Sequence, residues 1–317
     1  MAANVNEEVR VSVVCPCCGE QCSAKWMRVP RRDEDCASFF SLLRCSSCSH
    51  TWLENQPTPT ELKYYYGPDY HRAVGAAGEK SPKRRWGQQV EVITKFKSGG
   101  LVLDIGCSSG GFLAYLKSDR WRLYGIEADQ PTAERARAST GAEVFAGDVA
   151  DASFPDDTFD LVTCSDVLEH LYEPGGVFRK VYHWLKPGGI FYVFVPNIMS
   201  WEARVFRSYW YGLDLPRHLH HFSKKSLGTL AAYNGFRQLR MATPPGCYLE
   251  QSASAILHNE PSGASAQQVP EDQRVEPGLA WRLVRKGLRI ATEVPYSLIA
   301  SSCGTAPSLQ AIFQKGN

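Results

Sequence analysis

Four cysteines near the start of the sequence form two pairs with the same spacing. Cys15 lies three positions before Cys18, and Cys45 lies three positions before Cys48. Two tight turns of this kind can direct four thiolates at one tetrahedral zinc ion. A site closed by four thiolates has no open coordination position for a substrate. These residues therefore predict a structural zinc site, and catalysis must come from elsewhere in the chain.

The segment around these pairs, residues 1–56, is predicted to be a zinc ribbon. Residues 39–43 and 51–53 flank the second pair and have the composition of short strands. Because so short a segment cannot bury a sufficient core, zinc would supply much of its stability. Cys17 could replace a neighbour as a ligand. The lower-ranked ligands, none of which forms a second pair of this spacing, are Cys17, Cys22, Cys36 and His50.

Histidines form the second candidate group, because their pKa near neutrality suits removal of a proton from a substrate. Three of them lie in one loop just before Ser223, which could cap the following helix. This trio also suggests a metal site, but no nearby carboxylate pattern completes one. Each candidate could instead brace the backbone or line a helix. The predicted catalytic residues are His221 as first choice, His170 as second, and then His218, His220 and Glu169.

A third group of residues ends an apolar run and opens a turn of small residues. Asp104, Gly106 and Gly110 lie in the stretch LDIGCSSGGF, where the backbone can approach a ligand closely. The spacing is neither the G-x-G-x-x-G of dinucleotide sites nor a P-loop. An acid at this position would repel a pyrophosphate but suits a cationic amino group. The turn therefore favours a nucleotide-type ligand that carries a positive charge.

The elements that must position these residues alternate between helices and apolar strands after a predicted helix at 82–96. Such alternation implies a largely parallel sheet with an α/β architecture. Glu127 and Asp148 each follow a predicted strand, so both acids are expected at the same edge of the sheet as Asp104. The predicted strands are 101–106, 121–126, 142–146, 159–164, 190–195, 236–241 and 308–313.

Five ordered motifs, LDIGCSSGGF, GIEAD, GDVAD, FDLVTCSDVLEH and LKPGGIFYVFVPN, resemble those of class I S-adenosylmethionine-dependent methyltransferases. The resemblance covers about residues 82–244 and implies a Rossmann-like, seven-stranded sheet that binds S-adenosylmethionine. Ser108 stands where that family often has glycine, and a small side chain still fits. The cofactor-binding residues that the resemblance implies are Asp104, Gly106, Cys107, Ser108, Gly110, Phe112, Glu127, Ala128, Asp148, Val149 and Ser165.

The sequence indicates only the chemical class of the molecule that accepts the methyl group. The ribbon, the YYYGPDYH segment and the histidine loop resemble zinc-ribbon sugar C-methyltransferases, whereas the core resembles the coenzyme-Q O-methyltransferases. These resemblances imply a small-molecule or glycan-type acceptor, with methylation on oxygen favoured because the longer C-terminal domain of the sugar enzymes is not found. One alternative is an RNA methyltransferase that grips RNA through the ribbon. Another is a non-catalytic scaffold that binds S-adenosylmethionine.

Charge and composition limit the kinds of partner and the cellular location that the sequence favours. The 35 Lys and Arg residues nearly balance the 33 Asp and Glu residues, so no basic field favours nucleic acid. The start of the chain lacks the order of a secretory signal, and the uncharged run at 294–314 is broken by proline and glycine. We therefore expect a cytoplasmic protein without a transmembrane segment. Its oligomeric state is left open.

The remaining segments complete the predicted organisation. An aromatic linker at 57–81 contains Tyr64, Tyr65, Tyr66 and Tyr70, which could cover a ring-bearing substrate. The methyltransferase core is predicted at 82–257 and a mobile loop at 258–278. A C-terminal helix and the last strand follow at 279–317. The basic residues of that helix, near Arg282–Arg289, suggest peripheral contact with an anionic membrane surface.

Overall fold

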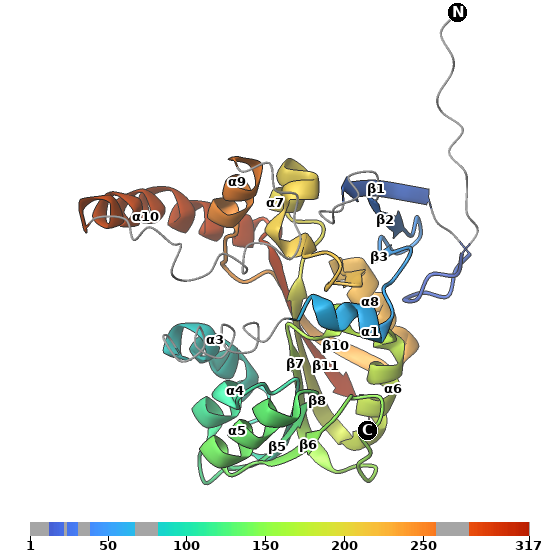
Figure 1. The fold of residues 1–317 in the computed structure, drawn as a ribbon. Coiled ribbons are helices and arrows are strands. Elements are labelled where there is room, and N and C mark those ends of the chain that lie inside the picture. Colours follow the sequence, from blue (N-terminus) through green and yellow to red (C-terminus); the bar gives the residue numbers. More distant parts are fainter. Residues whose placement is uncertain (1–12, 22–23, 31–38, 67–81, 258–278, 317) are drawn as a thin grey trace, which may run out of the picture. The chain divides into compact units, whose positions relative to one another are not determined.

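The computed structural model describes residues 13–21, 24–30, 39–66, 82–257 and 279–316 (Figure 1). The chain forms two compact units, each assembled from segments distant in sequence. The first unit combines Met1–Tyr65, Pro196–Thr229 and Ala242–Leu309. The second combines Tyr66–Val195, Leu230–Met241 and Gln310–Asn317. Cys22, Cys36, Tyr70 and the predicted loop at 258–278 lie outside the described residues.

A seven-stranded sheet forms the centre of the second unit, as predicted. Its strands lie in the order β10-β11-β8-β7-β4-β5-β6, and the four pairs β4–β5, β4–β7, β5–β6 and β7–β8 are parallel. The strands are β4 (Gly100–Ile105), β5 (Trp121–Glu127), β6 (Glu143–Ala146), β7 (Phe159–Ser165), β8 (Leu185–Pro196), β10 (Phe236–Ala242) and β11 (Ser308–Lys315).

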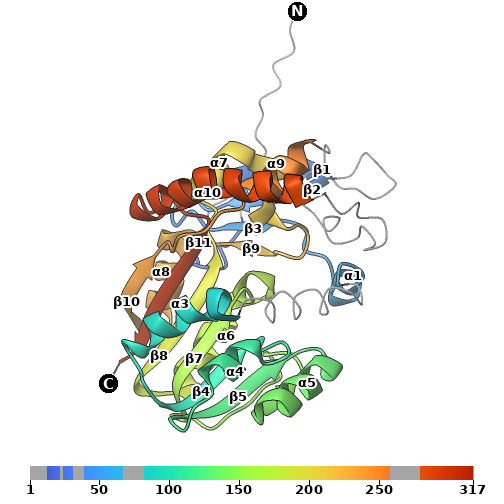
Figure 2. The same ribbon diagram turned by 90° about the vertical axis from the view of Figure 1, so that its left-hand side faces the viewer.

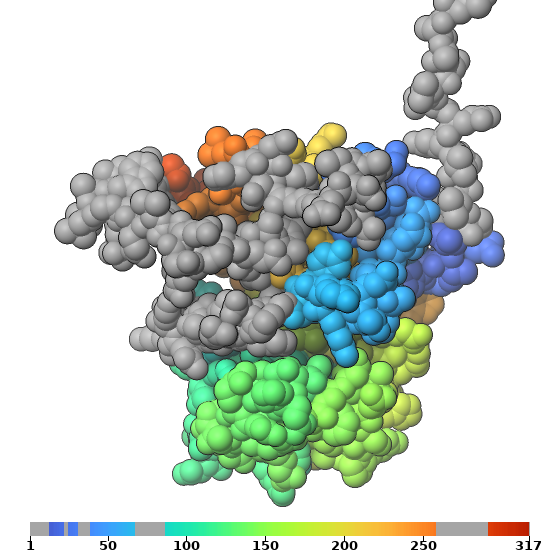
Figure 3. All heavy atoms as spheres, viewed as in Figure 1, coloured from blue at the N-terminus to red at the C-terminus, as the bar shows by residue number. Residues whose placement is uncertain are grey.

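Most residues of the central strands β4 and β7 are apolar and buried, because helices cover both faces of this sheet. Val102, Leu103, Leu161 and Val162 are all fully buried. Helices α3 (Pro82–Thr94), α4 (Gly111–Leu116) and α5 (Gln130–Thr140) cover one face, and α6 (Pro174–Trp184) covers the other (Figures 1 and 2). Figure 3 shows the α5 side of the unit as a closely packed surface. The helix expected at 82–96 is confirmed, with its end two residues earlier.

The first unit contains a smaller antiparallel sheet, in the order β1-β2-β3-β9. The two strands predicted around the second cysteine pair are β2 (Phe39–Arg44) and β3 (Thr51–Leu53). The others, β1 (Ala24–Pro30) and β9 (His220–His221), were not predicted. Strand β9 comes from the histidine loop, far from the ribbon in sequence. The small sheet is thus completed by a strand from outside residues 1–56.

One apolar core joins the ribbon strands to the segment that follows β8. Leu42 and Leu53 from the ribbon pack with Ile198, Trp210 and Leu219, and all of these are at most 2% exposed. The ribbon therefore shares a hydrophobic core with residues about 150 positions later. This sharing compensates for the small core that the ribbon could form alone.

Several helices complete the first unit or follow from it. Thr58 caps α1 (Pro59–Tyr64) with a capping box that includes Glu61. Ser223 Oγ accepts a hydrogen bond from Ser226 N at 3.0 Å, which confirms the predicted cap at the start of α8 (Lys224–Tyr233). The remaining helices are α7 (Trp201–Phe206), α9 (Leu249–Leu257) and α10 (Leu279–Ser302). Among the described helices, none combines the length and apolar character needed to cross a bilayer.

Candidate functional site

The turn after β4 has the backbone conformation that its small residues permit. Gly106, Ser108 and Gly110 all have positive φ, at 72°, 48° and 86°. A methyl group on Gly106 would overlap Cγ2 of Val167, so only glycine fits there without rearrangement. Gly110 N donates to Cys107 O at 2.9 Å and closes the turn before α4 begins. The chain thus forms a tight turn without large side chains in its backbone path, at the carboxyl end of β4.

Asp104 lies in β4 just before this turn and is almost completely buried. Its Oδ1 accepts a hydrogen bond from Thr163 Oγ1 at 2.6 Å, and among the described residues it has no cationic partner. Burial raises the pKa of Asp104 to about 7; the bond from Thr163 opposes this rise, and the nearby Glu127 adds to it. A buried carboxyl without a cation is suited to a ligand that supplies one.

Glu127 ends β5 and holds the backbone of two turns. Its Oε2 accepts from Ser108 N at 2.9 Å, and its Oε1 accepts from Asp129 N at 3.0 Å. A carboxylate oxygen can accept more than one hydrogen bond, so ribose hydroxyls could still be bound. Because β4 and β5 are parallel neighbours, Asp104 and Glu127 lie toward the same edge, as predicted.

The other predicted cofactor residues differ in exposure. Asp148 is exposed after β6, and its Oδ1 accepts from Ala150 N at 2.8 Å. Val149 beside it is buried, and Ala128 after β5 is exposed. Ser165, at the end of β7, is partly buried. Asp148, Ala128 and Ser165 therefore remain accessible to a ligand at this edge of the sheet.

Cys107 and Phe112 face the interior of the unit. Cys107 is buried, and its pKa is raised by burial and by the charges of Asp104 and Glu127. A methyl group on Gly125 would come within 2.6 Å of Cys107 Sγ, so this glycine makes room for the thiol. Phe112 is also buried and shapes the turn through packing.

Helix α3 contributes two residues that sequence analysis missed. The Trp86 ring packs edge-on against Phe112, with ring centroids 5.8 Å apart, and also lies beside Gly111. Gln89 is buried although polar, and its Oε1 lies 3.5 Å from Ser165 Oγ. A polar residue within an amphipathic helix carries no local signal of this placement. Only the packing of α3 over the turn reveals it.

The pair Glu169 and His170 follows β7 in a short 3-10 helix, Leu168–His170. Glu169 is 1% exposed, whereas His170 is half-buried. His170 Nδ1 lies 2.9 Å from the hydroxyl of Tyr66, a member of the aromatic linker. This contact fixes one ring nitrogen of His170 and orients the imidazole.

The loop histidines are held by contacts within the first unit. His221 is 1% exposed, and its Nε2 lies 3.0 Å from Leu213 O; its neighbour His220 pairs with Trp52 in the small sheet. His218 Nδ1 lies 3.0 Å from Gly212 O. Contacts of this kind suit the bracing role that the sequence left open, whereas the catalytic role of these residues stays a prediction.

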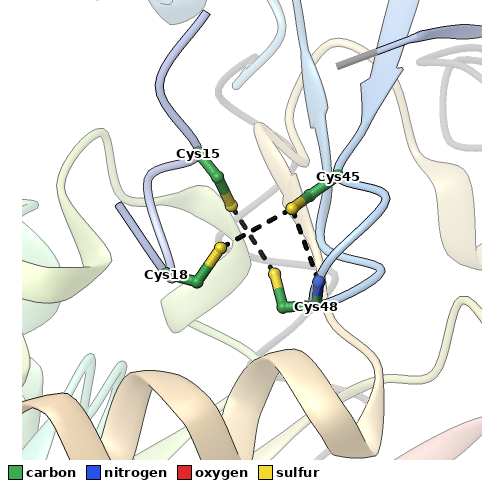
Figure 4. A group of neighbouring side chains, drawn as sticks. All are labelled: Cys15, Cys18, Cys45 and Cys48. Atoms are coloured by element: carbon green, nitrogen blue, oxygen red, sulfur yellow. Dashed lines mark hydrogen bonds between the residues drawn. The ribbon is translucent and has the colours of Figure 1, made fainter. Parts of the chain in front are cut away.

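The four paired cysteines meet at one point, as Figure 4 shows. All four Sγ atoms lie within 4.8 Å of one another, and the Cys15–Cys48 and Cys18–Cys45 Sγ distances are both 3.6 Å. Zinc–sulfur bonds of about 2.3 Å in a tetrahedron place sulfurs about 3.8 Å apart, so the set fits zinc. Cys17 is buried but does not belong to this set.

Backbone amides near the four cysteines favour the deprotonated, thiolate form of their sulfur atoms. Cys17 N and Cys48 N point at Cys15 Sγ and Cys45 Sγ, each at 3.4 Å. The contact with Cys48 and the amides of Cys17 and Cys18 lower the pKa of Cys15 to about 5, whereas the same contact raises that of Cys48. Clustered thiols of this kind release protons when a metal binds.

The second cysteine pair is joined directly to the histidine loop. Ser223 Oγ donates to Cys48 O at 3.3 Å, and Leu53 N donates to Leu219 O at 2.9 Å. The buried His50 lies with its Nε2 3.0 Å from His220 Nδ1. His50 thus contacts the loop and is not part of the four-cysteine set. The cysteine site consequently supports the segment 219–223.

Comparison with known proteins agrees with this geometry. Residues 79–240, just over half of the chain, match the family model described as a methyltransferase domain. Over 142 residues the chain is 33% identical to a sterol 24-C-methyltransferase of Aspergillus fumigatus, which covers 42% of this chain and 38% of that protein. Over 136 residues it is 30% identical to a ubiquinone biosynthesis O-methyltransferase of Pseudomonas entomophila, which covers 40% and 58%. The chain thus spans less than two thirds of these relatives.

A solved structure shares the fold. Phosphoethanolamine N-methyltransferase 2 of Haemonchus contortus, in complex with S-adenosyl-L-methionine, superposes with a TM-score of 0.54 at 15% identity. The match covers 84% of this chain and 62% of that one. The names of these three methyltransferases refer to different acceptors, so the comparisons leave the acceptor open.

Proposed function

Because this chain belongs to the methyltransferase-domain family and is an S-adenosylmethionine-dependent methyltransferase, we propose that it methylates an oxygen of a small-molecule or glycan-type acceptor. The observation that carries the donor site is the buried Asp104, which has no cationic partner among the described residues. We propose that Asp104 binds the amino group of the cofactor and that Glu127 binds its ribose hydroxyls. When bound, S-adenosylmethionine supplies a methyl group on a positively charged sulfur.

The remaining predicted contacts follow from the positions of the residues. The turn from Gly106 to Gly110 offers backbone amides at close range, and the exposed Asp148 can accept from the adenine amino group. Val149 and Phe112 supply apolar surface nearby, while Trp86 of α3 covers the turn. These residues would orient the donor so that its methyl group is presented to an acceptor.

Cofactor binding should be coupled to deprotonation of Asp104. Because burial raises its pKa to about 7, the carboxyl is largely protonated below that pH, and a cationic ligand must displace the proton. We expect S-adenosylmethionine affinity to rise from pH 5 to about 7 and then level off. Asp104→Asn should lower affinity about tenfold to a hundredfold at pH 8 and remove this dependence. Calorimetry across pH measures both effects.

The exposed acid Asp151 provides a matched control for this measurement. Asp151→Asn removes the same charge at an exposed position, so affinity and its pH dependence should stay as in the wild type. Unchanged binding in Asp104→Asn would remove Asp104 from the donor site. A wild-type affinity that is constant across this pH range would contradict the proposed proton release.

For the acceptor, we propose that His170 removes the proton. It follows β7 on the second unit, and the Tyr66 hydroxyl orients its ring while the residue stays partly exposed. Glu169, buried beside it, would act on the acceptor only through His170. His221 and His220 remain candidates, but their burial and their contacts favour a bracing role. Relatives that methylate small molecules support the acceptor class.

A screen with labelled S-adenosylmethionine tests this proposal. We expect methyl transfer to hydroxyl groups within a panel of sugar nucleotides and phenols, with His170→Ala reducing turnover about a hundredfold or more while donor affinity is unchanged. Tyr66→Phe should cost less, because it changes only the orientation of the imidazole. If His221→Ala abolishes turnover in a folded protein and His170→Ala does not, His221 is the base instead.

We propose that the four-cysteine set binds zinc as a structural ion. The support is its geometry, with sulfurs at tetrahedral spacing and no open position for a substrate. Four thiolates around a zinc ion stabilise two turns that the short ribbon could not hold otherwise. Its role would be to hold β3 and, through β3, the loop 219–223 in place.

A further inference from the structure

Helix α10 exposes apolar side chains to solvent, whereas an ordinary surface helix turns its apolar face toward the core. In its described C-terminal half, Val294, Leu298 and Ile299 are 49%, 56% and 54% exposed. Ala300, on the other side, is fully buried. Val294 and Leu298 are four residues apart and therefore share one face of the helix. The apolar stripe is directed away from the body of the unit.

Specific contacts hold this face outward. The Tyr296 ring packs against Trp201 of α7, with centroids 6.4 Å apart. Ser301 Oγ donates to Thr243 O at 2.6 Å, and Thr243 Oγ1 donates to Ser301 O at 3.3 Å. These contacts fix the last turns of α10 to the first unit from its polar side. Rotation that would bury the apolar stripe would break all of them.

Two neighbouring helices add apolar surface. Val205 of α7 is 74% exposed, and Ile256 and Leu257 of α9 are 48% and 83% exposed. Figures 1 and 2 show α7, α9 and α10 together at one end of the first unit. Single exposed apolar residues are common in soluble proteins. Their concentration on three adjoining helices marks an interaction surface.

The sequence of α10 indicates what this surface contacts. Val284, Leu288, Ala291, Val294 and Leu298 follow one another in steps of four, three, three and four residues, which is one helical face. The helix sequence contains four basic residues and one acidic residue, Glu293. If two copies of the chain paired through this helix, its basic residues would meet no complementary set of acidic residues on the other copy. The helix does complement an anionic lipid surface, where apolar groups enter the acyl boundary and cations meet headgroups.

We propose that α10, with α7 and α9 beside it, docks the protein on the surface of an anionic lipid bilayer. The helix lies in the interface and does not span the membrane. The exposed Val294, Leu298 and Ile299 enter the boundary region, and the excess of basic residues in the helix sequence favours anionic headgroups. Docking by this surface is independent of methyl transfer and of the proposed acceptor, so either proposal can fail alone.

Flotation of the full chain with vesicles tests the docking. We expect binding to phosphatidylcholine vesicles that contain about one third phosphatidylglycerol, and much weaker binding to phosphatidylcholine alone. The double variant Val294→Ser, Leu298→Ser should reduce binding at least about tenfold, because two exposed apolar groups are lost. The double variant Arg282→Gln, Arg285→Gln should reduce binding about thirtyfold on the anionic vesicles only.

A matched control changes two exposed aromatic residues outside these helices. Tyr64 and Tyr233 are 81% and 65% exposed, and Tyr64→Ser with Tyr233→Ser should leave vesicle binding unchanged. Equal binding by the Val294→Ser, Leu298→Ser variant, or no binding by the wild type, overturns the proposal. A dimer in sedimentation that dissociates in this variant, without vesicle binding, would assign the surface to a second copy instead.

Discussion

Replacing Cys45 with serine should release the zinc ion and lower the melting temperature by about 10 °C or more. Cys45 Sγ lies 3.6 Å from Cys18 Sγ and accepts the Cys48 amide, so its loss breaks both turns of the site. The effect is large because metal binding contributes directly to the folding free energy of such small modules. Zinc content by mass spectrometry and a thermal melt measure the two changes.

Cys17→Ser provides a stringent control for this experiment. Cys17 is buried between two members of the set in sequence but does not belong to it. Its serine variant should keep one zinc ion per chain and lose only the packing contribution of a small thiol. If Cys45→Ser retains its zinc, or if Cys17→Ser loses it, the ligand set is wrong.

Hydrogen exchange locates the consequence within the fold. Leu53 N donates to Leu219 O, and β9 pairs with β3, so amides in 219–223 depend on the ribbon. We expect these amides to lose protection in Cys45→Ser, while amides in β4 and β7 exchange as in the wild type. This pattern would separate a local role of zinc from general instability.

The large sheet could be predicted from sequence because its signals are local. The central strands are mostly apolar and are followed by turns that contain acids or small residues, and the motifs follow in chain order. Asp104 and Glu127 could be assigned to one edge from strand order alone. In the structure Asp104 accepts a hydrogen bond from Thr163, and Glu127 accepts hydrogen bonds from the amides of Ser108 and Asp129.

The small sheet could not be predicted completely, because one of its strands forms through pairing with a segment distant in sequence. Strand β9 consists of two histidines, which have no alternation and no apolar run. It is a strand only because β3 offers a partner backbone at Thr51 and Trp52. Because the sequence carries no strand signal there, it favours interpreting these histidines as catalytic candidates. Packing between segments distant in sequence decides such cases, and the placement of Gln89 of α3 beside Ser165 is another example.

Gly106 gives the sharpest test of the donor site. An alanine there must adopt a left-handed φ of 72°, and its methyl group overlaps Cγ2 of Val167. Strain of about 1–3 kcal/mol would be relieved by movement of the turn, away from the conformation that binds the cofactor. We expect Gly106→Ala to weaken S-adenosylmethionine binding about tenfold to a hundredfold in calorimetry.

Two further variants separate the clash from the backbone strain. Gly106→Ala combined with Val167→Ala removes the overlap but keeps the unfavourable φ, so it should recover part of the affinity. Gly141 has a similar φ of 75°, but a methyl group there meets no atom within 4 Å. Gly141→Ala should therefore cost some stability and leave cofactor binding intact, because it lies beyond α5 at the helix end. Equal binding losses in Gly106→Ala and Gly141→Ala would mean that the turn after β4 has no special role in holding the donor.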